Sequence, residues 1–248
     1  MKELRNILIL CRKYRQLQNM LDIQKHKSIL IQILKDIYSD GQVGPLLGFK
    51  GGTCAYLFYG LPRFSVDLDF NLLELEKKDF VFGKVQNILK EYGIIKEDRE
   101  ERFTLFFLLS YEDKAQNIKV EISRKIFPNR YVVKNYLGIS MLVLRKEDMF
   151  SHKLVALLER KRIANRDLFD IWFFSKNKWD FNKELLELRV KMDYKSYLKR
   201  CITEVERIDK KYILQGLGEL IEERQKEWVK ENLKKEVIFF LKFYLENY

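Results

Sequence analysis

Residues 64–72 read Phe-Ser-Val-Asp-Leu-Asp-Phe-Asn-Leu, a strict alternation of apolar and polar side chains. Side chains two residues apart on a β-strand point to the same face of the sheet. The alternation therefore predicts a strand that buries one face and keeps the other polar. The polar face carries Ser65, Asp67, Asp69 and Asn71.

The two aspartates of this strand stand side by side, and neighbouring carboxylates repel each other. A divalent cation between them relieves that repulsion. Mg²⁺ suits the arrangement, because it binds one or two carboxylates and completes its octahedron with water and phosphate oxygens. Asp67 and Asp69 are therefore predicted ligands of Mg²⁺. Two solvated acids on an exposed edge strand are the alternative, and the bare Asp-x-Asp pattern does not decide between them.

A second stretch of the chain repeats the alternation. Residues 118–123 read Ile-Lys-Val-Glu-Ile-Ser, which places Glu121 on the polar face of another predicted strand. If the two strands are neighbours, Glu121 lies beside the aspartate pair and can act as a general base or complete a second metal position. A plain surface glutamate is an equally good interpretation of this residue.

Upstream of the acidic strand, Gly51-Gly52-Thr53 stands between a predicted strand and a predicted helix. Small residues there let backbone N–H groups and the helix N-terminus approach a phosphate closely. Thr53 is a candidate N-cap of that helix. A phosphate cradle followed by a metal-binding strand supplies what phosphoryl transfer needs, namely anchored phosphates and a cation over the reacting phosphorus.

The chain as a whole divides into a strand-rich part and a helical part. Helical periodicity predicts one or two helices over residues 1–40. We then expect strands over 46–49, 64–72, 103–109, 118–122 and 139–144, with helices over 54–59 and 79–92. From Glu147 onward the pattern is helical, with breaks near Asn165, 177–179 and 216–218. This predicts an α+β fold with a catalytic lobe over residues 1–145 and a helical lobe over 146–248, the boundary lying near Arg145.

Composition narrows the class of partner. Of the 248 residues, 47% are hydrophobic, and the net charge is +11, which favours an anionic partner such as nucleic acid, a nucleotide or a membrane surface. A lysine-rich, solvated surface explains the charge equally well. No stretch is long enough to cross a membrane, and three widely spaced cysteines indicate neither disulfides nor a zinc site. We expect a cytoplasmic protein.

Two separated motifs resemble a known family. The runs Lys50-Gly51-Gly52-Thr53 and Tyr59-Gly60-Leu61-Pro62-Arg63-Phe64-Ser65-Val66-Asp67-Leu68-Asp69-Phe70 closely resemble the AbiEii/AbiGii-type nucleotidyltransferase toxins of the polymerase-beta-like superfamily. The segments 152–160 (His-Lys-Leu-Val-Ala-Leu-Leu-Glu-Arg) and 165–170 (Asn-Arg-Asp-Leu-Phe-Asp) are similar to that family's second signature. The match covers the catalytic lobe and the start of the helical lobe.

The resemblance implies a polymerase-beta-like lobe with a mixed sheet, followed by an all-helical lobe that completes the active site. It also implies Mg²⁺-dependent transfer of a nucleoside monophosphate from an NTP to the 3′ end of tRNA, by a toxin encoded beside an AbiEi-type antitoxin. Asp67 and Asp69 would be the metal ligands, and Lys153 and Asp167 the functional pair of the second signature. Glu121 takes the place of the superfamily's third acid, where many members have aspartate. The predicted nucleotide-binding residues are Gly51, Gly52, Thr53, Arg63, Ser65 and Lys153.

The second signature raises a geometric question. On one straight helix, Lys153 and Asp167 would be fourteen positions and roughly 21 Å apart, too far for both to serve one triphosphate. We therefore predict that the helix ends near 163–164 and restarts with Asn165 as N-cap, which places Asp167 in a first helical turn. Asp170 is equally compatible with a structural and a functional role. Both histidines, His26 and His152, are predicted to be non-catalytic.

Basic helices in the last third of the chain offer a surface for the RNA backbone. Their cations are Lys191, Lys195, Lys199, Arg200, Lys230, Lys234 and Lys235. A solvated helix face is the alternative. The aromatic groups 172–174 and 239–244 are predicted to be core. Two other functions stay open: transfer of a nucleotide to a small molecule, and a non-catalytic nucleic-acid-binding protein that kept the fold.

Overall fold

The computed structural model describes residues 23–112, 116–160 and 162–247. The chain forms two compact units. The first unit comprises residues up to 47 together with 66–125, and the second comprises residues 48–65 together with 126–248. The predicted helices over residues 1–40 are confirmed for 23–39, while residues 1–22 lie outside the described part of the chain.

Four strands of the first unit lie in the order β3-β4-β5-β2. β2 and β5 run parallel, whereas β3 with β4 and β4 with β5 run antiparallel. Besides the helix at 23–39, the first unit contains the elements η1 (Gly44–Leu46), β2 (Leu68–Leu72), η2 (Leu75–Lys77), α3 (Lys78–Lys90), β3 (Ile94–Glu101), β4 (Thr104–Ser110) and β5 (Ile118–Ser123).

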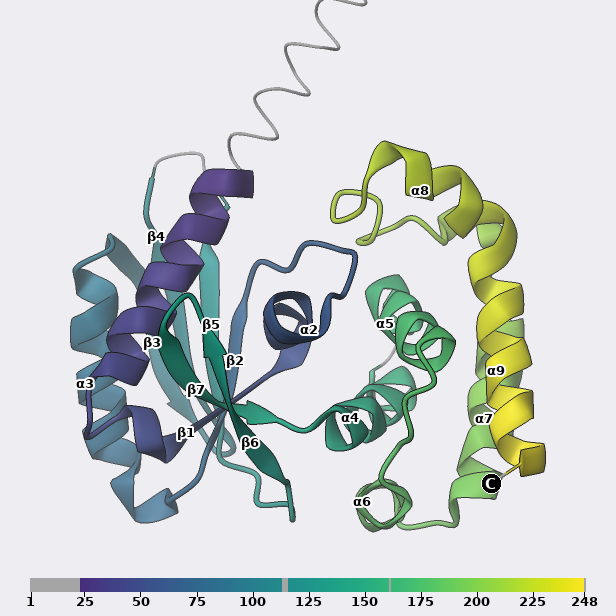
Figure 1. The fold of residues 1–248 in the computed structure, drawn as a ribbon, viewed down its shortest axis with the longest axis horizontal. Coiled ribbons are helices and arrows are strands. Elements are labelled where there is room, and N and C mark those ends of the chain that lie inside the picture. The colour runs from purple at the N-terminus through teal and green to yellow at the C-terminus, as the bar shows by residue number, and fades with distance from the viewer. Residues whose placement is uncertain (1–22, 113–115, 161, 248) are drawn as a thin grey trace, which may run out of the picture. The chain divides into compact units, whose positions relative to one another are not determined.

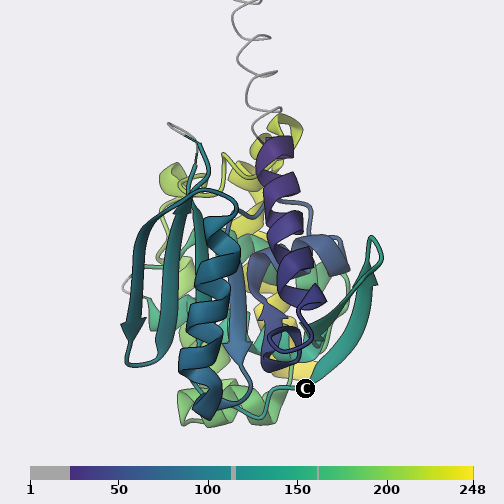
Figure 2. The same cartoon turned by 90° about the vertical axis from the view of Figure 1, so that its left-hand side faces the viewer.

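Helices cover one face of these four strands. The helix at 23–39 and α3 both lie on that face, as the two views show (Figures 1 and 2). The Phe82 ring of α3 lies 4.8 Å from the Phe107 ring of β4, and Tyr38 packs 6.4 Å from Phe70 of β2. Phe70 and Phe107 are fully buried. Every second side chain of β2, β4 and β5 thus belongs to the core. On the opposite face β2 and β5 carry polar side chains, whereas β4 carries Phe106 and Leu108.

The second unit contains three strands and most of the helices. β1 pairs in parallel with β7, which pairs antiparallel with β6. Its elements are β1 (Leu47–Lys50), α2 (Gly51–Tyr59), β6 (Tyr131–Tyr136), β7 (Ile139–Leu144), α4 (Lys146–Glu159), α5 (Asn165–Lys176), α6 (Lys183–Val190), α7 (Tyr194–Glu206), η3 (Lys210–Tyr212), α8 (Glu223–Trp228), η4 (Val229–Leu233) and α9 (Lys234–Asn247).

Aromatic side chains fill the space between these helices. The Phe150 ring of α4 lies 5.6 Å from Phe174 of α5 and 5.7 Å from Tyr244 of α9, and Trp179 stacks on Phe174 at 4.2 Å. α7 and α9 lie side by side (Figure 1). The predicted aromatic core is therefore confirmed for Phe174 and Tyr244. It is wrong for Phe239 and Phe243, which are 61% and 47% exposed.

Most predicted elements are present, with two strands missed. β3 and β6 carry no clear alternation of apolar and polar residues, which is why the sequence did not indicate them. The predicted strand over 64–72 begins only at Leu68. Every element assigned after Leu144 is helical, but the second unit also contains strands. A separate helical lobe with a boundary near Arg145 therefore stays a prediction.

No helix in the described ranges is long and apolar enough to cross a membrane.

Candidate active site

The acidic residues gather on the polar face of the first unit. Asp69 lies in β2 and pairs in register with Glu121 of the parallel strand β5. Asp67 directly precedes β2, and the buried residues Val66, Leu68 and Phe70 alternate with the two aspartates. The expected adjacency of the two strands is confirmed, and it brings three carboxylates to one face of the sheet.

A lysine that the sequence analysis did not single out lies among these acids. The Nζ atom of Lys119 is 3.5 Å from Oδ2 of Asp67 and 3.5 Å from Oε1 of Glu121. Lys119 and Glu121 are two residues apart on β5, so they share a face. That spacing was the available signal, but it acquires meaning only once β2 is known to be the neighbour of β5.

The donor set fits a magnesium ion held partly by substrate. Within the described residues, no group of three or more His, Cys, Asp or Glu side chains forms a metal-binding cluster. Mg²⁺ does not require one, since one or two carboxylates with water and phosphate oxygens suffice. The carboxylates of Asp67 and Glu121 already converge on a cation, the ammonium of Lys119. Oxygen donors that converge on a positive charge are suited to Mg²⁺.

In the glycine-rich turn of the second unit, the backbone lies close to the side chains of Arg63 and Ser65. Gly51 begins α2 with a φ of 80°, a left-handed conformation that favours glycine. A Cβ atom added to Gly52 would lie 2.7 Å from Oγ of Ser65 and 2.9 Å from Nη2 of Arg63. Only glycine therefore lets the Ser65 hydroxyl sit against the first turn of α2. Lys50 is the N-cap of this helix, so the prediction of Thr53 as N-cap is wrong: the helix begins three residues earlier.

The two signatures of the second unit meet in a buried network of ion pairs. Arg63 donates from Nε and Nη2 to the two carboxylate oxygens of Asp170, at 2.5 and 2.7 Å. Lys153 Nζ lies 2.7 Å from Asp167 Oδ1 and 2.8 Å from Asp170 Oδ2. The side chains of Asp167 and Asp170 are at most 1% exposed. Asp170 thus joins the first signature to the second, which is a structural role.

The predicted break between Lys153 and Asp167 is present, with different details. α4 ends at Glu159, four residues earlier than expected, and α5 begins at Asn165 with Ala164 as N-cap. The chain folds back between them, so Asp167 reaches Lys153 from the first turn of α5. Asn165 is not the N-cap. Its side-chain amide donates to the carbonyl oxygens of Tyr212 and Gln215 instead.

Charge pairing outweighs desolvation in this network. Burial alone would lower the pKa of Lys153, but the carboxylates of Asp167 and Asp170 raise it above its ordinary value. Burial would raise the pKa of Asp167, yet Lys153 lowers it. Arg160, another residue the sequence analysis passed over, places Nε 3.4 Å from Asp167 Oδ2 while its side chain stays 49% exposed. With Arg63, Lys153 and Arg160 against two aspartates, the group carries one net positive charge, which suits a phosphate.

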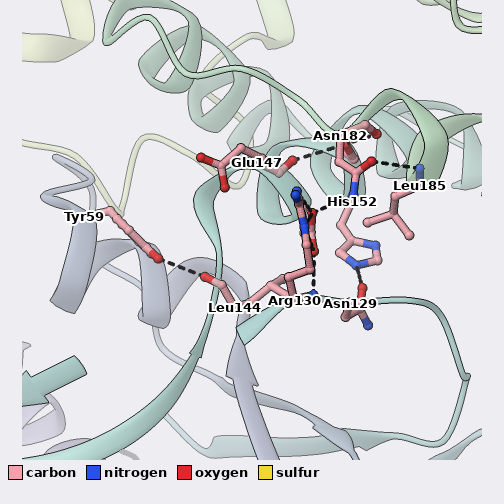
Figure 3. Close-up of polar contacts among 10 residues, drawn as sticks. Tyr59, Asn129, Arg130, Leu144, Glu147, His152, Asn182 and Leu185 are labelled. Atoms are coloured by element: carbon pink, nitrogen blue, oxygen red, sulfur yellow. Dashed lines mark hydrogen bonds and ion pairs between the residues drawn. The ribbon is translucent and has the colours of Figure 1, made fainter. Parts of the chain in front are cut away.

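Polar contacts fix helix α4, which carries Lys153 (Figure 3). Arg130 pairs with the fully buried Asp148 at 2.5 Å, and Asn182 donates to the same carboxylate at 2.8 Å. His152 Nε2 lies 2.7 Å from Oδ1 of Asn129, as Figure 3 shows. Burial, followed by the charge of Arg189, lowers the pKa of His152 well below its ordinary value. A buried, hydrogen-bonded histidine with a lowered pKa agrees with the prediction that His152 is non-catalytic.

A segment near the C-terminus braces the loop that leads to the aspartates. The N–H of Phe64 donates to the carbonyl of Leu220 at 2.7 Å, and Gln225 Nε2 donates to the carbonyl of Pro62 at 3.3 Å. Together with the contacts of Asn165, these bonds tie both signatures of the second unit to residues 212–225. The placement of Ser65 therefore depends on residues more than 150 positions away in the chain.

These observations define a class of protein. A glycine-rich turn at a helix N-terminus, an Asp-x-Asp strand and a third acid on the neighbouring parallel strand are the features that the resemblance assigns to nucleotidyltransferases. A family model described as nucleotidyl transferase AbiEii toxin, type IV TA system, matches residues 32–238. The chain belongs to this family of nucleotidyltransferase toxins. As a member of a type IV toxin–antitoxin family, it has an antitoxin partner.

Solved structures share the fold. JHP933 from Helicobacter pylori has a TM-score of 0.60 and 23% sequence identity, with 90% of this chain and 92% of that chain covered. A second H. pylori protein, provisionally named a nucleotidyltransferase, has a TM-score of 0.61 and 23% identity, with 90% and 94% covered. No curated protein matches the chain. At this identity the two structures support the fold alone.

Proposed function

We propose that the protein transfers a nucleoside monophosphate from an NTP to the 3′ end of an RNA, namely a tRNA, and that this reaction is its toxic activity. The observation that carries the proposal is the register that sets Asp69 beside Glu121, with Asp67 two residues upstream. Metal binding by two carboxylates together with a general base requires three acids, and this face of the sheet carries three.

The three acids have two different roles in this reaction. Asp67 and Asp69 hold Mg²⁺, which when bound supplies positive charge over the reacting phosphate. Glu121, whose side chain is 39% exposed, can reach an incoming hydroxyl. It takes the proton of that hydroxyl as the hydroxyl oxygen attacks the α-phosphorus, and pyrophosphate leaves as the bond to the α-phosphorus breaks.

The triphosphate binds to groups of the second unit. The backbone N–H groups of Gly51, Gly52 and Thr53 at the start of α2 and the hydroxyl of Ser65 face the phosphates, and Lys153 adds a compact positive charge. Ser65 and Asp67 are two residues apart, so the chain itself keeps their Cα atoms within about 7 Å. Covalent linkage alone thus keeps Ser65 close to Asp67.

Arg63 has a different role in this scheme. Its guanidinium donates to Asp170 and to the carbonyl of Phe64, and it is buried. These contacts favour a positioning role, in which Arg63 holds the loop that carries Ser65. Direct contact between Arg63 and the nucleotide stays a prediction.

An RNA acceptor accounts for the charge. The protein carries a net charge of +11, and α7 exposes Lys195, Lys199 and Arg200 on its surface. Such cations bind the phosphodiester backbone without specifying sequence. The protein would act in the cytoplasm, where tRNA is found, and its antitoxin would be of the AbiEi type and encoded nearby.

The test compares wild type with Asp67→Asn and with the control Asp180→Asn, which removes the same charge from an exposed loop of the second unit. Each protein is incubated with total RNA, Mg²⁺ and one α-labelled NTP at a time. We expect wild type and the control to label a tRNA-sized species, and Asp67→Asn to lose labelling at least 100-fold while it keeps its melting temperature.

Growth is measured in parallel, at matched soluble levels and without the antitoxin. Wild type and Asp180→Asn should arrest growth, and Asp67→Asn should not. If Asp67→Asn arrests growth fully without labelling RNA, toxicity comes from binding, and the proposal is wrong. Labelling of a small molecule in place of RNA would assign the enzyme a different acceptor.

A further inference from the structure

Four charged side chains share the polar face of β2 and β5: Asp67, Asp69, Lys119 and Glu121. The register of the parallel pair sets Asp69 opposite Glu121 and Leu68 opposite Val120, so Asp67 and Lys119 are neighbours one step earlier. Lys119 Nζ lies 3.5 Å from an oxygen of Asp67 and 3.5 Å from an oxygen of Glu121. The ammonium therefore stands between a predicted metal ligand and the predicted general base.

The other neighbours of Lys119 direct it toward these acids. On β4, the residues in register with Lys119 and Glu121 are Leu108 and Phe106, both apolar. The side chains of Asp67 and Lys119 are 19% and 31% exposed, so solvent weakens their attraction without removing it. Lys119 thus has one charged partner next to β2, Asp67, and one on its own strand, Glu121, whereas its neighbour in register on β4 is apolar.

We propose that Lys119 is a built-in counter-cation that competes with the divalent metal for Asp67, and so sets the metal concentration at which the site fills. This inference rests on the proposed assignment of Asp67 and Asp69 as metal ligands. Without metal, the ammonium relieves the repulsion among three carboxylates. A divalent ion bound to Asp67 lies close to the ammonium, and like charges at that separation repel, so the metal must displace Lys119.

The decisive measurement is the affinity of the full-length, metal-free protein for Mn²⁺ alone, by calorimetry, without nucleotide. Lys119→Met removes the competing charge and keeps an unbranched apolar chain. We expect its dissociation constant for Mn²⁺ to be about tenfold lower than that of wild type, since a charge within 4–6 Å shifts such equilibria by one log unit or more. The melting temperature without metal should fall, and the rise on adding Mn²⁺ should be larger.

Three further variants isolate the effect. Lys119→Arg keeps the charge and should keep an affinity within about twofold of wild type. Lys96→Met removes one positive charge from an exposed position of β3 in the same unit and should leave the affinity unchanged. Lys119→Gln replaces Lys119→Met if the latter fails to fold, with the same expected gain in affinity.

The outcomes separate this inference from the proposed function. If wild type binds no Mn²⁺, or if Asp67→Asn binds Mn²⁺ as tightly as wild type does, the assignment of Asp67 as a metal ligand is wrong. If wild type binds Mn²⁺ at Asp67 but Lys119→Met binds it equally or more weakly, the counter-cation inference is overturned. A higher KM for NTP with an unchanged Mn²⁺ affinity would make Lys119 a phosphate ligand, which also overturns it.

Discussion

At the scale of single residues, Lys153 holds two carboxylates that have almost no contact with water. Asp167 is at most 1% exposed and lies 2.7 Å from the ammonium, and Asp170 lies at 2.8 Å. A buried carboxylate that loses its counter-charge is far more costly than a surface ion pair that breaks. The same lysine is the predicted ligand of the triphosphate, so its removal should affect both stability and catalysis.

We therefore expect Lys153→Ala to lower the free energy of unfolding by about 3 kcal/mol. The KM for NTP should rise at least tenfold in the fraction that stays folded. Lys146→Ala, an exposed lysine in the first turn of the same helix, should change stability by less than about 0.5 kcal/mol. Urea denaturation and initial rates at several NTP concentrations provide both values. If the rates of Lys153→Ala fall only in proportion to its unfolded fraction, Lys153 does not contact phosphate.

At the scale of elements, the start of α2 leaves no room for a side chain at Gly52. A Cβ on Gly52 would stand 2.7 Å from the Ser65 hydroxyl, whereas a Cβ on Gly83 in α3 would meet nothing within 4 Å. Both glycines lie inside helices, where alanine is favoured by about 1 kcal/mol. The same substitution therefore has opposite consequences at the two positions.

Gly83→Ala should raise the free energy of unfolding by up to about 1 kcal/mol without changing activity. In Gly52→Ala the gain in helix propensity offsets part of an overpacking cost of about 1–3 kcal/mol, so the net loss of stability should be small. Its NTP turnover should nevertheless fall by more than tenfold, because Ser65 is pushed off the helix N-terminus. Thermal melts and NTP turnover of both variants test this. Normal turnover by Gly52→Ala would remove the turn from the phosphate-binding site.

At the scale of the whole molecule, the excess of positive charge is the feature that would bind the proposed RNA acceptor. Lys195, Lys199 and Arg200 are exposed on α7, and the chain has an excess of eleven positive charges. For a single strand, log Kd rises with log salt concentration by about 0.7 per phosphate contacted. A small-molecule acceptor would show almost no such dependence.

Replacing Lys195, Lys199 and Arg200 together with glutamine should lower the salt slope of tRNA binding by about 2, with NTP binding unchanged. The control replaces Lys35, Lys90 and Lys96, three exposed lysines of the first unit, and should lower the slope by less than about 0.5. Filter binding at salt concentrations from about 50 to about 300 mM measures the slopes of both triple variants, because an affinity that depends on phosphate contacts falls steeply over this range. Equal slopes for the two triple variants would mean that the charge acts without a defined surface.

Local patterns in the sequence determined much of this protein. The alternation around Asp67 and Asp69 predicted a buried strand, the Gly51-Gly52 turn a close approach, and the motifs of residues 50–70 and 152–170 the family. Each of these signals is contained in a short stretch of the chain, and side-chain periodicity on a strand or helix is a local property. Even the break between α4 and α5 followed from the distance that Lys153 and Asp167 must bridge.

Tertiary structure decided which of these groups meet. Arg63 and Asp170 are 107 residues apart, and nothing near either one indicates the other. Lys119 lies between two acids only because β2 and β5 pair in one particular register. The segment 212–225, which hydrogen-bonds to both signatures, carries no recognisable motif. β3 went undetected because its side chains are mostly charged and exposed. Register and long-range pairing depend on how all the elements pack at once, so only the folded chain determines them.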